Sequence, residues 1–388
     1  MEDTTGRNVP HSVLANDQRV GDTRQRLRDV LSAQTCAGAI MSFGRKAATL
    51  AGAGVLGATL AATGAAADSY TLQSQFALNI PSIGPSPQHV AQLVEGLSRG
   101  EMQIEVHGVG DFVPGAEVFG AVSSGALDMA FDSAVYWSQQ IPAATIFAAL
   151  PFGPSPEISM GWMYRGGGRE IIQKAYDPFN VRYIPCHLVI QEAGGWYNKE
   201  INSAEDFRGL TMRIVGPGGL VLARLGANTQ AIPAGEVYLS LDTGRVDAAE
   251  LSMPSVDEGM GFEQVAKYYY FPGWHQGAGW DSIIVNGDVW DKMGPEQQNY
   301  LEQACQANVT YQLADQIDTQ AAAIAKFREH GVEIRRFPDE VLRVLRQEAN
   351  AMLDEQAAED ELFAEALASI RDYMATAGEW TELQAIPE

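Results

Sequence analysis

The stretch EVYLSLDTGRVDAAEL, from Glu236 to Leu251, decides the fold, because the chain carries a second copy of its pattern. It predicts a short helix, a stop at Gly244 and a strand that starts at Val246. The other copy is EVFGAVSSGALDMAF, residues 117–131, and in both copies Gly and Asp follow the Glu by eight and eleven residues. Such a repeat predicts two related α/β lobes whose strand ends face a shared crevice, where open α/β sheets bind ligands. The alternative is two ordinary helix-to-strand connections.

Composition excludes several classes of function. The chain has 388 residues, enough for two lobes, and its hydrophobic content of 46% is typical of soluble globular proteins. Its net charge of −23 should repel nucleic acid and anionic lipid surfaces, so we expect no nucleic-acid partner. An anionic ligand remains compatible with this charge, because one buried arginine can dominate a small site. The sequence contains no nucleophile elbow, zincin motif or Walker loop, so we expect no catalysis.

The N-terminal part of the chain carries a targeting signal. Residues 41–67 contain Arg45 and Lys46, then an uncharged run rich in Ala, Gly and Leu, and end in Ala65-Ala66-Ala67. A basic region, an apolar region and a small-residue cleavage site together predict a cleavable signal peptide and a periplasmic protein. The alternative is a transmembrane anchor. Residues 1–40 are polar and are interpreted as an over-extended start or a disordered leader.

Apolar and turn residues divide the rest of the chain. Residues 68–190 are expected to form mainly lobe I and residues 191–285 mainly lobe II, with the lobes exchanging segments. From Pro295 to Gly331, apolar residues recur every three or four positions, which predicts a helix of about 36 residues and roughly 54 Å. A helix of that length should span both lobes. Two further helices are predicted at 338–357 and 361–377.

A few side chains are candidates for binding a ligand. Arg213 lies on an otherwise apolar strand, where a guanidinium is costly unless it is paired. It either clamps a ligand carboxylate or makes a structural salt bridge to Glu236 or Asp247. Glu250 ends the second repeat strand and should point into the crevice or lie at its rim. Trp196 is interpreted as a pocket wall or as core.

The cysteines leave two possibilities open. Cys186 and Cys305 remain after removal of the leader, and they either pair in an oxidising compartment or stay buried as free thiols. The histidines include no pair at helical spacing, which argues against a histidine-based metal site.

Three stretches, FRGLTMRIVGPGG, IPAGEVYLSLDTGRVDAAE and VAKYYYFPGWH, resemble the DctP-like solute-binding proteins of tripartite ATP-independent periplasmic (TRAP) transporters. The likeness covers nearly all of the chain from about Tyr70 and is greatest to the subgroup that binds α-keto acids and related carboxylates. It implies a two-lobe clamshell that closes on a small organic acid, an α-keto or hydroxy carboxylate. It also implies delivery of that acid to the permease subunits in the membrane. The competing hypothesis is a periplasmic enzyme that uses Glu250 and His275 as an acid/base pair on a small carboxylic acid.

The resemblance also assigns roles to individual residues. It implies that Arg213 binds the ligand carboxylate and that Tyr136 belongs to the aromatic segment of lobe I that faces the ligand. Glu250 matches an acidic residue that holds a cation beside the ligand. The subgroup has Trp where Leu251 stands and Gln where Glu192 stands, with Gln191 next to it.

These departures leave the cation open. If Glu192 faces Glu250 across the crevice, two carboxylates favour a hard divalent cation such as Ca²⁺. If Gln191 occupies the site instead, Na⁺ or no ion would suit it. The cation ligands are then drawn from Glu250, Leu251 and one of Gln191 and Glu192.

The C-terminal helix suggests a homodimer. Leu362, Phe363, Leu367, Ile370 and Tyr373 recur at near-helical spacing on this terminal segment. They either contact a second protomer or pack against the lobes of their own chain.

Overall fold

The structure is a computed structural model that describes residues 67–384. The leader expected at 1–40 and the signal peptide expected at 41–67 lie outside these residues, apart from position 67. Among the helices of residues 67–384, none has both the length and the apolar composition needed to cross a membrane.

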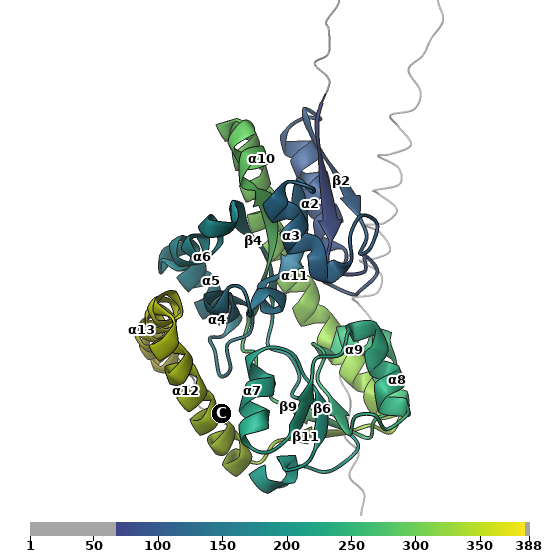
Figure 1. The fold of residues 1–388 in the computed structure, drawn as a ribbon. Helices are drawn as coiled ribbons and strands as arrows, with labels where there is room; N and C mark the ends of the chain where they lie inside the picture. The colour runs from purple at the N-terminus through teal and green to yellow at the C-terminus, as the bar shows by residue number, and fades with distance from the viewer. Residues whose placement is uncertain (1–66, 385–388) are drawn as a thin grey trace, which may run out of the picture. The chain divides into compact units, whose positions relative to one another are not determined.

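The first sheet has five strands in the order β2-β1-β3-β10-β4 and defines lobe I (Figure 1). Its strands are β1 (Asp68–Ser74), β2 (Met102–His107), β3 (Met129–Ser133), β4 (Val181–Val189) and β10 (Gly279–Asn286). β1 pairs in parallel with β2 and β3, whereas β10 runs antiparallel to both β3 and β4. The helices of this part of the chain are α2 (Ser86–Leu97), α3 (Val118–Ser124), α4 (Thr145–Ala148), α5 (Pro156–Arg165), α6 (Gly168–Tyr176) and α10 (Gly287–Lys292).

The second sheet has six strands in the order β11-β9-β5-β8-β6-β7 and defines lobe II. Its strands are β5 (Gly195–Tyr197), β6 (Thr211–Arg213), β7 (Asn228–Gln230), β8 (Ala248–Ala249), β9 (Tyr268–Phe271) and β11 (Glu333–Arg336). Its helices are α7 (Pro217–Arg224), α8 (Val237–Asp242) and α9 (Pro254–Met260). The predicted α/β architecture with two lobes is confirmed.

The lobes exchange strands in both directions. All of β10 except its last residue lies within the range 191–285 that was expected to form mainly lobe II, yet the strand is inserted between β3 and β4 of the first sheet. All eight residues of β10 are buried, as expected for a central strand that is covered on both faces. In the other direction, β11 follows the long helix and pairs in parallel with β9 in lobe II.

Both copies of the repeat form the same local structure. Each has a short helix, α3 or α8, then a glycine with positive φ, and then a strand, β3 or β8. The Asp of each copy makes the same bond, because Asp128 accepts from the backbone N–H of Thr71 and Asp247 accepts from that of Thr211, at 2.9 and 3.0 Å. The repeat is therefore a duplicated structural unit, in which the Asp accepts a hydrogen bond from the backbone of the neighbouring parallel strand.

The long helix α11 (Pro295–Glu329) has 35 residues and a length of roughly 53 Å. It contacts β4 and α2 in lobe I and α9 in lobe II, so the predicted spanning helix is confirmed (Figure 1). The expected apolar face is interrupted in the middle, because Ile317 is 70% exposed while Gln312 and Gln316 are buried.

Amide side chains occupy that interruption at intervals of four residues: Asn308, Gln312, Gln316 and Gln320. We name these four residues the amide ladder. Asn308 donates to the carbonyl of Cys186 and Gln316 to that of Leu188, each at 2.9 Å. At the lobe II end, Gln320 accepts from the backbone N–H of Ser255 at 2.9 Å. Amides replace apolar residues here because the helix crosses backbone groups at strand ends, which need hydrogen-bond partners when buried.

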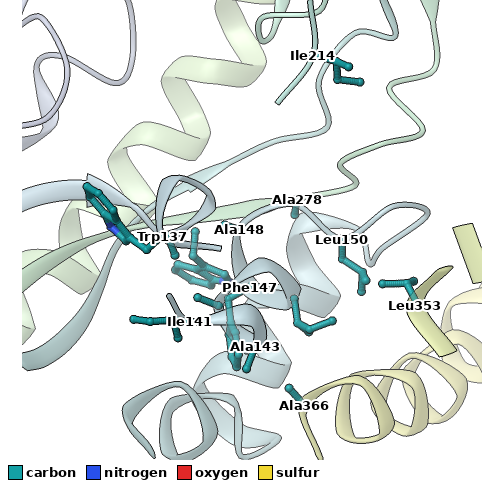
Figure 2. Packing of buried hydrophobic residues seen from close by; sticks show 14 of the residues in the cluster. Trp137, Ile141, Ala143, Phe147, Ala148, Leu150, Ile214, Ala278, Leu353 and Ala366 are labelled. Carbon is teal, nitrogen blue, oxygen red and sulfur yellow. The ribbon is translucent and has the colours of Figure 1, made fainter. Parts of the chain in front are cut away.

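Two further helices complete the chain, α12 (Asp339–Glu359) and α13 (Glu361–Leu383). Their inner faces belong to one continuous hydrophobic cluster, which joins Phe147 and Leu150 of lobe I, Ile214 of lobe II, Leu353 of α12 and Ala366 of α13 (Figure 2). The helices therefore pack against both lobes.

A disulfide bond joins Cys186 of β4 to Cys305 of α11. It settles the two possibilities that the sequence left open for these cysteines. The bond connects the long helix covalently to lobe I, whereas contacts of α11 with lobe II are made by side chains such as Gln320 and Lys326, which pairs with Glu258.

Candidate functional site

A cavity of about 110 Å³ lies between the two lobes. Its polar lining from lobe II includes Arg213, Glu250, Glu192 and His275. Lobe I contributes mainly apolar side chains and one carboxylate, Asp281. The strand ends of both sheets face this space, as the repeat predicted.

Arg213 ends β6 and is only 1% exposed, although it lines the cavity. Its Nε donates to the carbonyl of Ile232 at 3.0 Å, and its Nη1 donates to the backbone carbonyl of Glu250. The Glu250 carboxylate lies 3.4 Å from the same Nη1. The salt bridges that the sequence allowed for Arg213 are absent, because Glu236 pairs with Arg245 and Asp247 pairs with Lys199.

Three buried side chains, Glu192, Glu250 and His275, form the second polar group of the cavity, which we name the acidic trio. His275 Nε2 lies 3.0 Å from Glu192 Oε2 and 3.4 Å from Glu250 Oε1. One donor atom from each residue lies within 4.8 Å of the others, so the trio has the composition and the spacing of a cation site. His275 Nδ1 is buried without a hydrogen-bond partner among the residues that the structure describes.

The charges of the trio depend on one another. Burial raises the pKa of Glu192 to about 7, against the opposing hydrogen bond from His275. Burial also pushes the pKa of Glu250 upward, but His275 and Arg213 outweigh it and hold that pKa below its usual value. Burial opposes protonation of His275, yet the two carboxylates raise its pKa to about 10. Without a bound cation, a protonated His275 therefore bridges the two glutamates at neutral pH.

The VAKYYYFPGWH stretch positions His275 by a close backbone approach. A Cβ at Gly273 would lie 2.1 Å from the carbonyl oxygen of Glu192, so only glycine lets the two segments meet. Likewise, a Cβ at Gly218 would lie 2.8 Å from the Cβ of His275. The glycines of both motifs are thus needed to bring His275 beside Glu192.

The structure brings most of the predicted site residues to the cavity. Arg213, Glu250, Glu192, Tyr136 and Leu251 line it. Tyr136 is 45% exposed and packs edge-on against Phe76 of lobe I.

Two candidates lie elsewhere. Gln191 is exposed, and its amide faces the carbonyl of Gly273 at 3.4 Å. Trp196 is fully buried, stacks on Tyr269 and donates to Asp257 at 2.8 Å, so it belongs to the core of lobe II.

Sequence reasoning did not find Asp281. It stands at the start of the apolar strand GWDSIIVN and is 3% exposed. A single carboxylate in an otherwise apolar strand could have identified Asp281 as a candidate site residue, as a single charge in an apolar strand identified Arg213. Its partner His187 could not be found in this way, because only the pairing of β10 with β4 places the two residues opposite each other.

Comparison with known proteins identifies the class of protein to which this chain belongs. Residues 82–360 match the DctP family of bacterial extracellular solute-binding proteins, family 7. The monocarboxylate 2-oxoacid-binding periplasmic protein of Nostoc sp. is 34% identical over 71% of this chain and 75% of that protein.

Two solved structures of TRAP periplasmic solute-binding proteins share the fold. The protein from Colwellia psychrerythraea, with bound calcium and pyruvate, is 32% identical to this chain and has a TM-score of 0.79. The aligned region covers 82% of this chain and 97% of that protein. The protein from Pseudoalteromonas atlantica, with bound sodium and pyruvate, is 30% identical with a TM-score of 0.77 over the same shares.

The chain belongs to the DctP family and is a periplasmic solute-binding protein of the TRAP type. The family resemblance inferred from the three sequence motifs is therefore confirmed. Glu250 and His275 lie close together, as the enzyme hypothesis required. The chain nevertheless belongs to a family of solute-binding proteins that are not enzymes.

Proposed function

We propose that this protein captures a small 2-oxo or 2-hydroxy monocarboxylate and delivers it to the permease subunits of a TRAP transporter. The observation that carries the proposal is Arg213, a buried guanidinium on the cavity wall. Its Nε and Nη1 are bonded to Ile232 and Glu250, while its Nη2 has no hydrogen-bond partner among residues 67–384. The protein groups thus fix the orientation of the guanidinium and leave donors for a ligand carboxylate. The ligands of the relatives support the same chemical class.

We further propose that the acidic trio holds a cation beside the ligand. Two carboxylates and an imidazole suit a hard or borderline cation, and the two negative charges favour Ca²⁺ over Na⁺. A metal-bound imidazole must be unprotonated, so cation binding should displace the proton that His275 otherwise carries. When bound, the cation would supply positive charge that offsets the ligand carboxylate; Glu192 and Glu250 hold it, and Arg213 orients the ligand.

Three features of the proposal concern the rest of the protein. Residues 41–67 act as the signal peptide that exports the chain. The permease subunits receive the ligand. A homodimer remains a prediction. The apolar face of α13 that suggested it packs within its own chain, because Phe363, Leu367 and Ile370 are buried there. Light scattering that gives a monomer mass at all concentrations would reject the dimer.

A thermal-shift panel tests the proposed function. Purified protein is heated with millimolar pyruvate, 2-oxobutyrate, lactate or glycerol, each in Ca²⁺, in Na⁺ and in EDTA. We expect the carboxylates to raise the melting temperature and the neutral glycerol to leave it unchanged, because only ligands that bind the native state stabilise it. We also expect a larger carboxylate-dependent shift in Ca²⁺ than in EDTA. If no carboxylate stabilises the protein in any of the three conditions, the proposed function is wrong.

A further inference from the structure

The lobe I wall of the cavity is largely apolar, and its polar members are Ser133, Tyr136 and Asp281. Its apolar members are Phe76, Ile80, Ile83, Val135, Ala148 and Ala149. Asp281 is 3% exposed and does not belong to the acidic trio, which lies on lobe II. A carboxylate in such surroundings is costly unless its oxygens accept hydrogen bonds.

One oxygen of Asp281 is held by a buried relay from the amide ladder. The amide orientation of Gln316 is set by two backbone partners, since its Oε1 accepts from Ile190 N–H at 3.0 Å and its Nε2 donates to Leu188 at 2.9 Å. The same Nε2 lies 3.5 Å from His187 Nε2. An amide nitrogen only donates, so His187 Nε2 is the acceptor and Nδ1 carries the hydrogen. His187 Nδ1 then donates to Asp281 Oδ2 at 2.9 Å.

The second oxygen, Asp281 Oδ1, has no side-chain hydrogen-bond partner among residues 67–384. The strand irregularity between Asp281 and Ser282 contributes to this arrangement, because such bulges redirect a side chain next to a binding site. The protein therefore fixes an acceptor on the cavity wall and leaves its partner to the ligand.

We propose that Asp281 Oδ1 accepts a hydrogen bond from a hydroxyl group of the ligand, so that the preferred solute is a carboxylate with a hydroxyl at the end that faces lobe I. This inference rests on the proposed function, because Arg213 must orient the carboxylate toward lobe II. A hydroxyl has one hydrogen to donate, and Oδ1 satisfies it.

Matched ligand pairs test this proposal by calorimetry on the purified, processed protein in Ca²⁺ buffer. 2-Oxobutyrate is compared with hydroxypyruvate, and 2-oxovalerate with 4-hydroxy-2-oxobutyrate, so that each pair exchanges a methyl for a hydroxyl at constant size. We expect the hydroxylated member of at least one pair to bind roughly tenfold more tightly, because a hydrogen bond to a charged group has about that worth. Equal or weaker binding of both hydroxylated members would overturn the proposal.

Two variants of Asp281 sharpen the test. Asp281→Asn keeps a polar partner for His187 but removes the charge, and it should reduce the preference to less than about threefold. Asp281→Leu should reverse it, so that the methyl-bearing ligand binds more tightly. The control is Asp132→Asn, a change of a buried carboxylate in the same lobe that does not line the cavity, which should leave the preference as in the wild type.

The possible results separate this inference from the proposed function. If no member of either pair binds the wild-type protein, the proposed function fails and this inference fails with it. If both members bind and Asp281→Leu leaves their ratio unchanged, only the role of Asp281 is wrong. A melting temperature for each variant shows whether it is folded, and the wild-type ratio decides the matter even if Asp281→Leu does not fold.

Discussion

The two lobes place different residues at the same position of the duplicated unit. Gln73 on β1 pairs with Ala130 of β3, and Arg213 on β6 pairs with the matching Ala249 of β8. Both side chains donate to the carbonyl just before a proline, Gln73 to Val113 at 2.7 Å and Arg213 to Ile232 at 3.0 Å.

The two side chains differ in the hydrogen-bonding groups that they have left after this shared bond. The Gln73 amide is engaged at both ends, because its Oε1 also accepts from the backbone N–H groups of Phe112 and Val113. Arg213 has further donors and a charge, and it lines the cavity. The same backbone frame thus carries a neutral amide in lobe I and a guanidinium on the cavity wall in lobe II, which is why the fold alone does not reveal the site.

The largest expected effect concerns the attachment of α11 to each lobe. The disulfide joins α11 to lobe I and closes a loop with a sequence separation of 119 residues, whereas no disulfide joins the helix to lobe II among the described residues. Replacing Cys186 and Cys305 by Ala should lower the free energy of unfolding by about 4 kcal/mol, measured by urea titration. Hydrogen exchange should increase mainly in β4 and α11. A loss below about 1 kcal/mol would show that the bond contributes little.

The next effect separates Arg213 from Gln73. Arg213→Ala should weaken pyruvate binding at least 100-fold, about 3 kcal/mol, because a charge-assisted bond is lost and the carboxylate is left unpaired. Gln73→Ala should lower the melting temperature, because three hydrogen bonds of a buried side chain are lost, but should leave the Kd within about threefold. Calorimetry and thermal unfolding of both variants check this contrast. If Arg213→Ala binds pyruvate within threefold of the wild type, the arginine is structural.

The smallest effect concerns a buried Asp in each lobe. Burial raises the pKa of Asp132 in lobe I and of Asp257 in lobe II to about 7. The folded state then retains a proton that the unfolded state releases between the usual carboxyl pKa of about 4 and pH 7, so stability falls as pH rises through that window. Asparagine needs no such proton. The free energy of unfolding of Asp132→Asn or Asp257→Asn, minus that of the wild type, should therefore be higher at pH 8 than at pH 5, by on the order of 1 kcal/mol.

Urea titrations at pH 5 and pH 8 measure this difference, and an unchanged difference between variant and wild type would contradict it. Ca²⁺ should distinguish the two lobes. Repulsion from Glu250 and Glu192 contributes to the raised pKa of Asp257, but not to that of Asp132. A cation bound by these glutamates should thus reduce the pH effect at Asp257 alone.

The parts of the account that the sequence could predict are those with local signals. The repeat, the spanning helix and Arg213 all depend on spacing or on a charge in an apolar strand. The order of the strands carries no local signal, so the return of β10 to lobe I and the meeting of Asp281 with His187 were missed. The amide ladder was not predicted, because its four-residue spacing is hidden within the apolar period that identified α11.

The central claim is that the lobe II side of the cavity binds a carboxylate group through Arg213. Calorimetric titration of the wild-type protein with pyruvate and with methyl pyruvate, in Ca²⁺ buffer, tests it most directly. The ester has nearly the same shape at the keto end but lacks the negative charge. We predict that pyruvate binds and that the ester binds at least about 100-fold more weakly, because it cannot form the charge-assisted pair with the guanidinium. Equal affinity for the acid and its ester would contradict the claim.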